Sequence, residues 1–415
     1  MKVKDVLTKI VPRSILTSRG YPTIEVDLQT SMGTFRASCP SGASTGSKEA
    51  MVILDGDDEY NGRGVKHAIQ KINVMEQNLM MLSCNATDIN GIDNYLLSLD
   101  SSPNKSNVGG NTMIALSMAF CKMCAAFSSM RVDEYLSITS GFDRKMPVPH
   151  FNLLNGGAHS GNGMSVQEIM VAYQYDDLER NIESVCVLYE SLRKLIAEEY
   201  GSLYVSVGDE GGYAPPIKSI EEGLDLIIKA SEMCGRTNFR FAIDFAANEF
   251  YRDGKYIFDG NEYSTSELGK KYLGILASYP QIYSLEDPFN EGDYEGWKWL
   301  TQNAGASVNI VGDDLTVTNS RLVDDAGAKR LCNVLLVKPN QIGTVSEVIE
   351  AIKIARMHNM KIMVSHRSGE TEDCFISDLA VGVGAEYIKA GAPCRGERVA
   401  KYNQLLRLNE NRHNV

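Results

Sequence analysis

The chain has 415 residues, of which 43% are hydrophobic and 23% charged, so it has ordinary globular composition. It has enough apolar surface to fold without disulfide bonds or a structural metal. Its length suggests two or three folding units. A formal net charge of -12, from 41 Lys and Arg against 53 Asp and Glu, argues against a nucleic-acid-binding surface, which requires a net basic footprint.

The nine cysteines are scattered over the chain, and the N-terminal segment has no secretory apolar core, which indicates reduced thiols in a cytoplasmic protein. Cys121 and Cys124 form a lone CxxC without the second pair or nearby His that a zinc site requires. The surrounding stretch MIALSMAFCKMCAAF is shorter than the roughly 20 apolar residues of a membrane span. We therefore expect a buried helix here and no membrane span.

The first part of the chain alternates between strand and helix patterns. Residues 3–38 alternate apolar and polar side chains, with a turn at Met32 and Gly33, and predict an antiparallel ribbon. Residues from about 60 to 136 have mostly helical periodicity. Together they predict a smaller α+β N-terminal domain over residues 1–145.

The pattern changes at Met146. Two apolar runs, PVPHFNLL and VQEIMVAY, are separated only by the Gly-rich and Asn-rich NGGAHSGNGM, so they predict neighbouring strands with no helix between them. Two amphipathic helices are then expected, the first around Val185 and Leu192 and the second at IEEGLDLIIKASEMC.

Six short apolar runs follow, as expected for buried parallel strands: FRFAID, QIYSLE, NIVGD, NVLLVK, KIMVSH and AEYIKA. A charged or titratable residue stands at or near the end of each run: Asp244, Glu286, Asp313, Lys338, His366 and Lys389. The successive differences in residue number are 42, 27, 25, 28 and 23, close to the roughly 31 residues of a (β/α) unit. The pattern predicts an α/β fold with a TIM-type (β/α)8 barrel over residues 146–415.

Parallel barrel strands direct their C-terminal ends to one mouth, so these six side chains should converge. Three carboxylates at one mouth repel each other unless a cation relieves them, and hard oxygen ligands suit magnesium or manganese. Asp244, Glu286 and Asp313 therefore predict a metal site. Lys338 can act as a base only when it is partly neutral, and a metal together with Lys389 should lower its pKa.

The remaining cationic groups suit an anionic substrate. Arg367 can bind a phosphate or carboxylate with two hydrogen bonds, and Lys389 and His366 lie at neighbouring strand ends. The whole set suits abstraction of a proton beside a carboxylate, with a metal stabilising the developing enolate charge.

Eight motifs in order resemble the enolase family over nearly the whole chain: PSGASTG, LNGGAHSG, VGDEGGYAP, LEDPF, GDDLTVTN, LLVKPNQIGT, SHRSGETED and IKAGAP. The resemblance implies a barrel of the enolase variety, ββαα(βα)6, after the N-terminal domain. It also implies reversible, magnesium-dependent dehydration of 2-phospho-D-glycerate to phosphoenolpyruvate in glycolysis and gluconeogenesis. Two Mg²⁺ ions per site are implied, the second bound with substrate.

The resemblance also implies a role at each matching position. Lys338 is the expected base that removes the proton alpha to the carboxylate, and Glu210 is the expected acid that helps the hydroxyl leave, supported by Glu168. The expected ligands of the first magnesium ion are Asp244, Glu286 and Asp313, and Ser44 completes the second site. The expected substrate contacts are His159, Glu168, His366, Arg367, Ser368 and Lys389.

The loops around Ser44 and His159 are expected to close over the site, since closure excludes water from a reactive enolate. PSGASTGSK lacks the GxxxxGK[ST] spacing, which argues against a nucleotide-binding loop. Departures from the usual family pattern lie outside the proposed catalytic set: Thr17, Tyr21, Val52, Leu54 and Gly396.

Family dimers are joined by ion pairs between N-terminal and C-terminal segments. Arg13, Glu25, Arg407 and Glu410 are available for such pairs, so we expect a homodimer. Two alternatives remain beside an active enolase. One is a superfamily relative that acts on a different carboxylate, and the other is a barrel with a binding or structural role.

Overall fold

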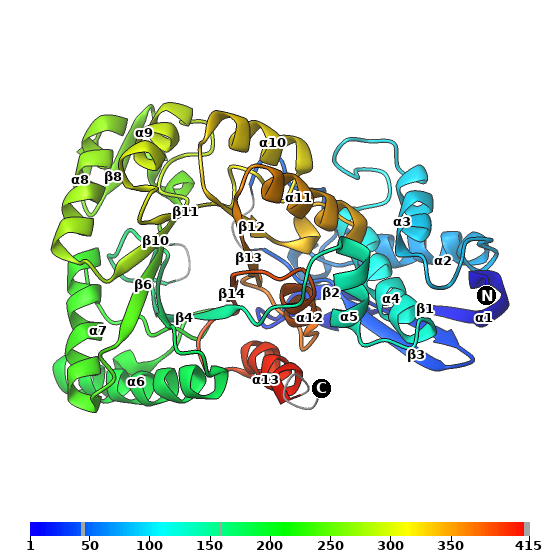
Figure 1. The fold of residues 1–415 in the computed structure, drawn as a ribbon, viewed down its shortest axis with the longest axis horizontal. Coiled ribbons are helices and arrows are strands. Elements are labelled where there is room, and N and C mark those ends of the chain that lie inside the picture. Colours follow the sequence, from blue (N-terminus) through cyan, green and yellow to red (C-terminus); the bar gives the residue numbers. More distant parts are fainter. Residues whose placement is uncertain (43–45, 158–159, 411–415) are drawn as a thin grey trace.

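The structure, a computed structural model, describes residues 1–42, 46–157 and 160–410. In the N-terminal part, β1 (Leu7–Leu16), β2 (Pro22–Thr30) and β3 (Gly33–Ser38) form an antiparallel sheet in that order, after the short α1 (Val3–Val6). The helices that follow are α2 (Lys66–Met80), α3 (Ile89–Ser98), α4 (Gly110–Phe127) and α5 (Val132–Ser140). Figure 1 shows this blue and cyan part lying beside the barrel.

Helix α4 contains the most apolar stretch of the sequence. In the described part of the chain it is the helix long and apolar enough to cross a bilayer by length and composition, and 83% of it is buried inside the protein. Cys121 and Cys124 lie on this helix as buried free thiols, and burial raises the pKa of Cys121 well above its usual value. The expectation of a packed core helix is confirmed.

A closed barrel follows, with the strands in the order β10, β11, β12, β13, β14, β4, β5, β6. Strand β5 pairs antiparallel with β4 and with β6, whereas the other neighbours are parallel. This confirms the expected fold class. The bounds are β4 (Val148–Asn155), β5 (Glu168–Tyr173), β6 (Phe239–Asp244), β10 (Ile282–Glu286), β11 (Asn309–Gly312), β12 (Val334–Val337), β13 (Lys361–Ser365) and β14 (Tyr387–Lys389).

Helices surround the strands, as Figure 1 shows for α6 to α11. The two amphipathic patterns form α6, which the side chain of Asp177 caps at its start, and α7, which Gly235 ends in a left-handed conformation. The bounds are α6 (Leu178–Glu199), α7 (Ile220–Cys234), α8 (Thr265–Ser278), α9 (Tyr294–Ala304), α10 (Ser320–Lys329), α11 (Val345–Met357), α12 (Phe375–Gly382) and α13 (Gly396–Glu410).

The longest interval between strand ends, 42 residues from Asp244 to Glu286, contains an unexpected small sheet. It consists of β7 (Tyr251–Arg252), β8 (Lys255–Phe258) and β9 (Asn261–Tyr263). Strands this short have too few residues for an alternating pattern to stand out. The insertion accounts for the irregular spacing.

Polar contacts join the N-terminal part to the barrel. The buried carboxylate of Asp93 accepts hydrogen bonds from Ser117 Oγ at 2.7 Å and from the backbone N of Ser346 at 2.9 Å. Lys105 on the N-terminal side binds Glu347 Oε1 at 2.7 Å. These bonds place helices of the N-terminal part against the start of α11.

Asp378 on α12 provides a pH test of the packing against α13. Burial raises its pKa to about 7, although Gln404 donates to its Oδ1 at 3.0 Å. Because the folded pKa of Asp378 is raised above the unfolded value of about 4, the free energy of unfolding falls as the pH rises from about 4 to about 7. Asp378→Asn removes the titration, so its stability relative to the natural chain should be greater at pH 8 than at pH 5.

The expected gain between the two pH values is roughly 2 kcal/mol. Urea unfolding of both proteins at each pH measures this difference in the free energy of unfolding. The contributions of other titrating groups cancel because they are the same in both proteins. A difference between the proteins that does not change with pH would contradict the raised pKa.

Candidate active site at the mouth of the barrel

Strand register puts the predicted side chains at one level of the mouth. Glu168 at the start of β5 pairs with Asp244 at the end of β6, and Asp244 also pairs with Glu286 at the end of β10. Lys389 ends β14 and pairs with Ser365 at the end of β13. Because β5 runs opposite to its neighbours, its first residue lies at the same end as their last residues.

Lys389 lies among the acids. Its Nζ donates to Glu286 Oε1 at 2.7 Å and to Asp244 Oδ2 at 3.2 Å, and it reaches Glu168 Oε2 at 3.5 Å. Burial, and then the neighbouring carboxylate of Asp244, raise the pKa of Glu286 well above its usual value, although Lys389 opposes this shift. The crowded carboxylates therefore gain from any further positive charge.

The chemistry of these acids fits a hard divalent cation. Glu286 Oε2 is buried and has no hydrogen-bond partner among the described residues, so one carboxylate oxygen remains to be satisfied. Asp244 and Asp313 supply further carboxylate oxygens, the ligand type that magnesium prefers.

The predicted trio is not the tightest acidic group in the described part of the chain. The groups whose ligand atoms lie within 4.8 Å of one another are Glu168 with Glu210 and His366, and Asp287 with Asp313 and Asp314. Lys389 contacts both Asp244 and Glu286, while Asp313 pairs with Lys338.

Lys338 follows β12, and its Nζ donates to Asp313 Oδ2. Gln341 Nε2 donates to Asp313 Oδ1 at 2.9 Å. The hydroxyl of Thr318 accepts from the backbone N of Lys338 at 2.9 Å and donates to Gln341 Oε1 at 2.8 Å. Val317 and Thr318 have φ of 42° and 55°, a strained conformation for β-branched residues, and these bonds hold Thr318 in it.

We expect a metal together with Lys389 to lower the pKa of Lys338. Lys389 by itself does not lower it. Burial, the largest influence, lowers the pKa of Lys338, but the neighbouring carboxylates, Asp313 first, raise it, and the net shift is upward despite the repulsion from Arg367 and Lys389. A neutral Lys338 therefore requires that another cation share the charge of Asp313.

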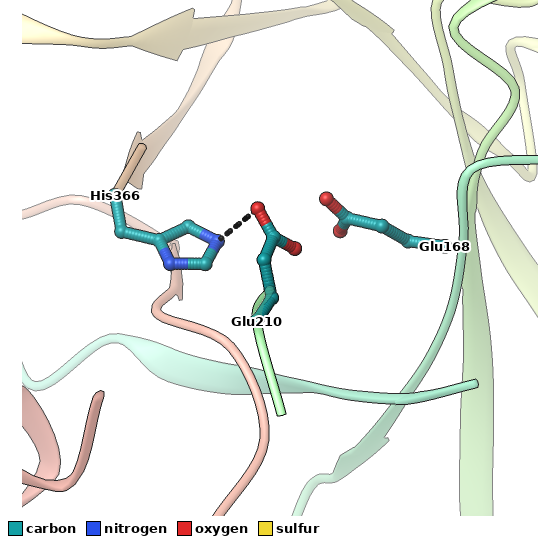
Figure 2. Close-up of side chains that lie close together, drawn as sticks. All are labelled: Glu168, Glu210 and His366. Atoms are coloured by element: carbon teal, nitrogen blue, oxygen red, sulfur yellow. Dashed lines mark ion pairs between the residues drawn. The ribbon is translucent and has the colours of Figure 1, made fainter. Parts of the chain in front are cut away.

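Glu210 lies between His366 and Glu168, and Figure 2 shows the two carboxyl groups facing each other. His366 Nε2 is 3.5 Å from Glu210 Oε1, and Asn152 Nδ2 donates to Glu210 Oε2 at 3.0 Å. Burial, and then the charge of Glu210, raise the pKa of Glu168 well above its usual value. A Glu168 carboxyl with a raised pKa beside Glu210 is suited to acid catalysis.

Arg367 and Ser368 follow β13 in the same region. The guanidinium of Arg367 binds Glu49 at two points, Nη1 to Oε2 and Nη2 to Oε1, both at 3.0 Å. Asn340 Oδ1 accepts from Arg367 Nη1 at 3.1 Å, so the plane of the guanidinium is fixed. The buried Ser368 Oγ has no hydrogen-bond partner in the described residues and can serve a ligand.

A small cavity of about 20 Å³ connects these groups. Most of the predicted catalytic and substrate-binding side chains line it: Glu168, Glu210, Lys338, His366, Arg367, Ser368 and Lys389, together with the predicted ligand Asp244. Ser44 and His159 lie outside the described residues. A cavity of about 920 Å³ elsewhere is lined by other residues, among them Lys145 and Asp177.

Several residues that hold this site together are not among those predicted from the sequence. Asn340 and Gln341 lie in the LLVKPNQIGT motif directly after Lys338, so their position in the motif was an available signal. Glu49 lies just after PSGASTG and pairs with Arg367 from a distant part of the chain. Spacing along the sequence does not reveal such a pair.

Two family models match the chain. The model described as "Enolase, N-terminal domain" matches residues 7–136, and the model described as "Enolase, C-terminal TIM barrel domain" matches residues 143–414. Curated relatives named enolase are similar over nearly the full length.

The relative from Thermococcus kodakarensis is 43% identical over 410 residues, and the one from Thermococcus gammatolerans is 42% identical over 410 residues. Each alignment covers 97% of this chain and 94% of the relative. The relative from Methanothrix thermoacetophila is 42% identical over 406 residues, which are 97% of this chain and 96% of its own. The chain therefore belongs to the enolase family, whose members are magnesium-dependent hydro-lyases.

Proposed function

We propose that the chain catalyses the reversible dehydration of 2-phospho-D-glycerate to phosphoenolpyruvate, with Lys338 as base and Glu210 as acid. The observation that carries the proposal is the arrangement of the cavity. Lys338 and the pair of Glu168 and Glu210 line one small space, together with the cations Arg367 and Lys389. A base, an acid and an anion-binding group that line one cavity are what a dehydration beside a carboxylate requires.

In this proposal Lys338 Nζ removes the proton from the carbon alpha to the carboxylate. Glu210 gives a proton to the hydroxyl on the neighbouring carbon, which leaves as water. The proton-holding carboxyl of Glu168 faces Glu210 and supports its return to the acid form. Microscopic reversibility exchanges the roles in the hydration direction.

Arg367 and Ser368 would bind the phosphate. Both terminal nitrogens of Arg367 donate to Glu49 in the structure, so the phosphate would have to replace this carboxylate as their acceptor. The buried Ser368 Oγ, which has no partner among the described residues, could donate to a ligand oxygen. Lys389 and His366 would contact the substrate from neighbouring strands. His159, outside the described residues, would add a contact from its loop.

Asp244, Glu286 and Asp313 would hold the first magnesium ion, and Ser44, outside the described residues, would help to hold a second that binds with substrate. Bound magnesium supplies positive charge that stabilises the developing enolate. The side chain of Asp313 would then be shared, and its hold on the proton of Lys338 would weaken.

Absorbance in the ultraviolet tests the reaction directly. The chain should form phosphoenolpyruvate from 2-phosphoglycerate with magnesium, and activity should fall to background with chelator and return when magnesium is restored. Absence of product with magnesium present would contradict the proposed function.

We also propose the division of the chain into an N-terminal domain of residues 1–145 and a barrel domain of residues 146–415. The family matches, which end at residue 136 and begin again at residue 143, support a boundary in this region. A homodimer in the cytoplasm remains part of the proposal. Arg13 binds Glu25 at 2.6 Å and Asp27 at 2.5 Å within the chain, so these two predicted contact residues already pair with each other.

A further inference from the structure

Arg398 on α13 is a fully buried cation that lies directly behind the proposed acid site. Its Nη1 donates to His366 Nδ1 at 2.7 Å and to the carbonyl oxygen of Arg367 at 2.6 Å. Its Nη2 donates to the carbonyl oxygens of Ser368 at 2.6 Å and Asp209 at 3.0 Å. One guanidinium thus ties the residue before Glu210 to the segment that carries three proposed substrate contacts.

The contact with Arg398 settles which nitrogen of His366 carries the proton. A guanidinium has only donors, so Nδ1 of His366 must offer a lone pair to it. Burial, and then the charge of Arg398, lower the pKa of His366 well below its usual value, so the ring is neutral. A neutral ring that accepts at Nδ1 carries its proton on Nε2.

The protonated nitrogen then faces the proposed acid. His366 Nε2 is 3.5 Å from Glu210 Oε1, and Figure 2 shows the ring pointing at this carboxyl group. If the imidazole ring of His366 were flipped by about 180°, a C–H group would face the guanidinium, and one donor of Arg398 would have no acceptor. Arg398 therefore selects both the tautomer and the orientation of the ring.

We propose that Arg398 is a positioning residue that holds His366 as the Nε2–H tautomer, so that His366 donates toward Glu210 and orients its carboxyl group. The inference rests on the proposed role of Glu210 in loss of the hydroxyl. Arg398 itself does not contact the substrate in this proposal. Its replacement should lower the rate of dehydration rather than the rate at which Lys338 removes the alpha proton.

Arg398→Lys keeps the charge but replaces two donor nitrogens held in one plane by a single ammonium nitrogen with three donors, which cannot reach all four acceptors of the guanidinium at once. Dehydration should fall by about tenfold or more, as for loss of a partner that orients a histidine. Exchange of the alpha proton with solvent should change by less than about threefold, and kcat should fall more than KM rises.

Lys401 provides a matched control from the same helix. It is also buried, and its Nζ donates to Glu370 Oε2 at 2.9 Å and to the carbonyl oxygen of Thr371 at 2.6 Å. Lys401→Met therefore removes a buried cation that binds the same loop farther along the chain. It should lower stability and leave the ratio of exchange to dehydration as in the natural chain.

Nitrogen-15 NMR of the natural, magnesium-loaded chain tests the tautomer without any variant at Arg398. Signals of His366 are assigned by their loss in His366→Gln. We expect the proton on Nε2 and an unprotonated Nδ1 in the natural chain, and a mixture of tautomers in Arg398→Lys.

A proton on Nδ1, or a doubly protonated ring, in the natural chain would overturn the inference even if Arg398→Lys does not fold. An unchanged ratio of exchange to dehydration in a folded Arg398→Lys would also overturn it. Failure of the proposed function has a different signature, because the natural chain would then form no phosphoenolpyruvate whatever its tautomer.

Discussion

Lys338→Ala should abolish exchange of the alpha proton of 2-phosphoglycerate with solvent and, with it, formation of phosphoenolpyruvate. The only role proposed for Lys338 Nζ is to carry this proton, and alanine leaves no basic group in its place. Loss of a general base costs up to about 10⁴-fold, or about 5 kcal/mol of transition-state stabilisation. Proton NMR of substrate in deuterated water measures exchange, and ultraviolet absorbance measures product.

The barrel offers a matched control for this variant. Lys361 begins β13 at the opposite end of the strands, and its Nζ donates to Asn309 Oδ1 at 3.0 Å. Lys361→Ala removes a lysine from the same barrel without touching the mouth, so it should retain exchange. Exchange in Lys338→Ala at a rate close to that of the control would remove Lys338 from the proposed role.

The strand ends could be predicted because the barrel repeats one unit, and each buried strand is a short apolar run followed by a polar residue at the mouth. Asp244 and Glu286 were therefore found from pattern and charge alone. Their register, which places Asp244 between Glu168 and Glu286, depends on the antiparallel β5 and is seen only in the structure.

Other parts of the site depend on contacts between segments distant in sequence, for which one chain carries no periodic signal. Glu49 meets Arg367 across 318 residues, and Arg398 reaches His366 from a helix with no motif to mark it. The raised pKa of Lys338 could not be predicted either, because its direct contact with Asp313 is not visible in the sequence.

Glu210→Gln should separate the two halves of the proposed reaction. Glutamine keeps the size of the side chain, and its one amide oxygen can accept from either Asn152 or His366, but its amide cannot give up a proton to a leaving hydroxyl. Dehydration should fall by roughly 10²-fold or more, while Lys338 continues to exchange the alpha proton. Exchange and product formation are measured on the same samples.

Glu386→Gln is the control for this variant. Glu386 is a partly buried carboxylate that pairs with Arg356 at 2.8 Å and accepts from the backbone N of Ile362 at 2.8 Å, near the starts of β13 and β14. Its replacement should affect stability and leave both rates close to those of the natural chain. Equal loss of exchange and dehydration in Glu210→Gln would instead mean that Glu210 acts before or during proton removal, and the division of labour between Lys338 and Glu210 would have to be abandoned.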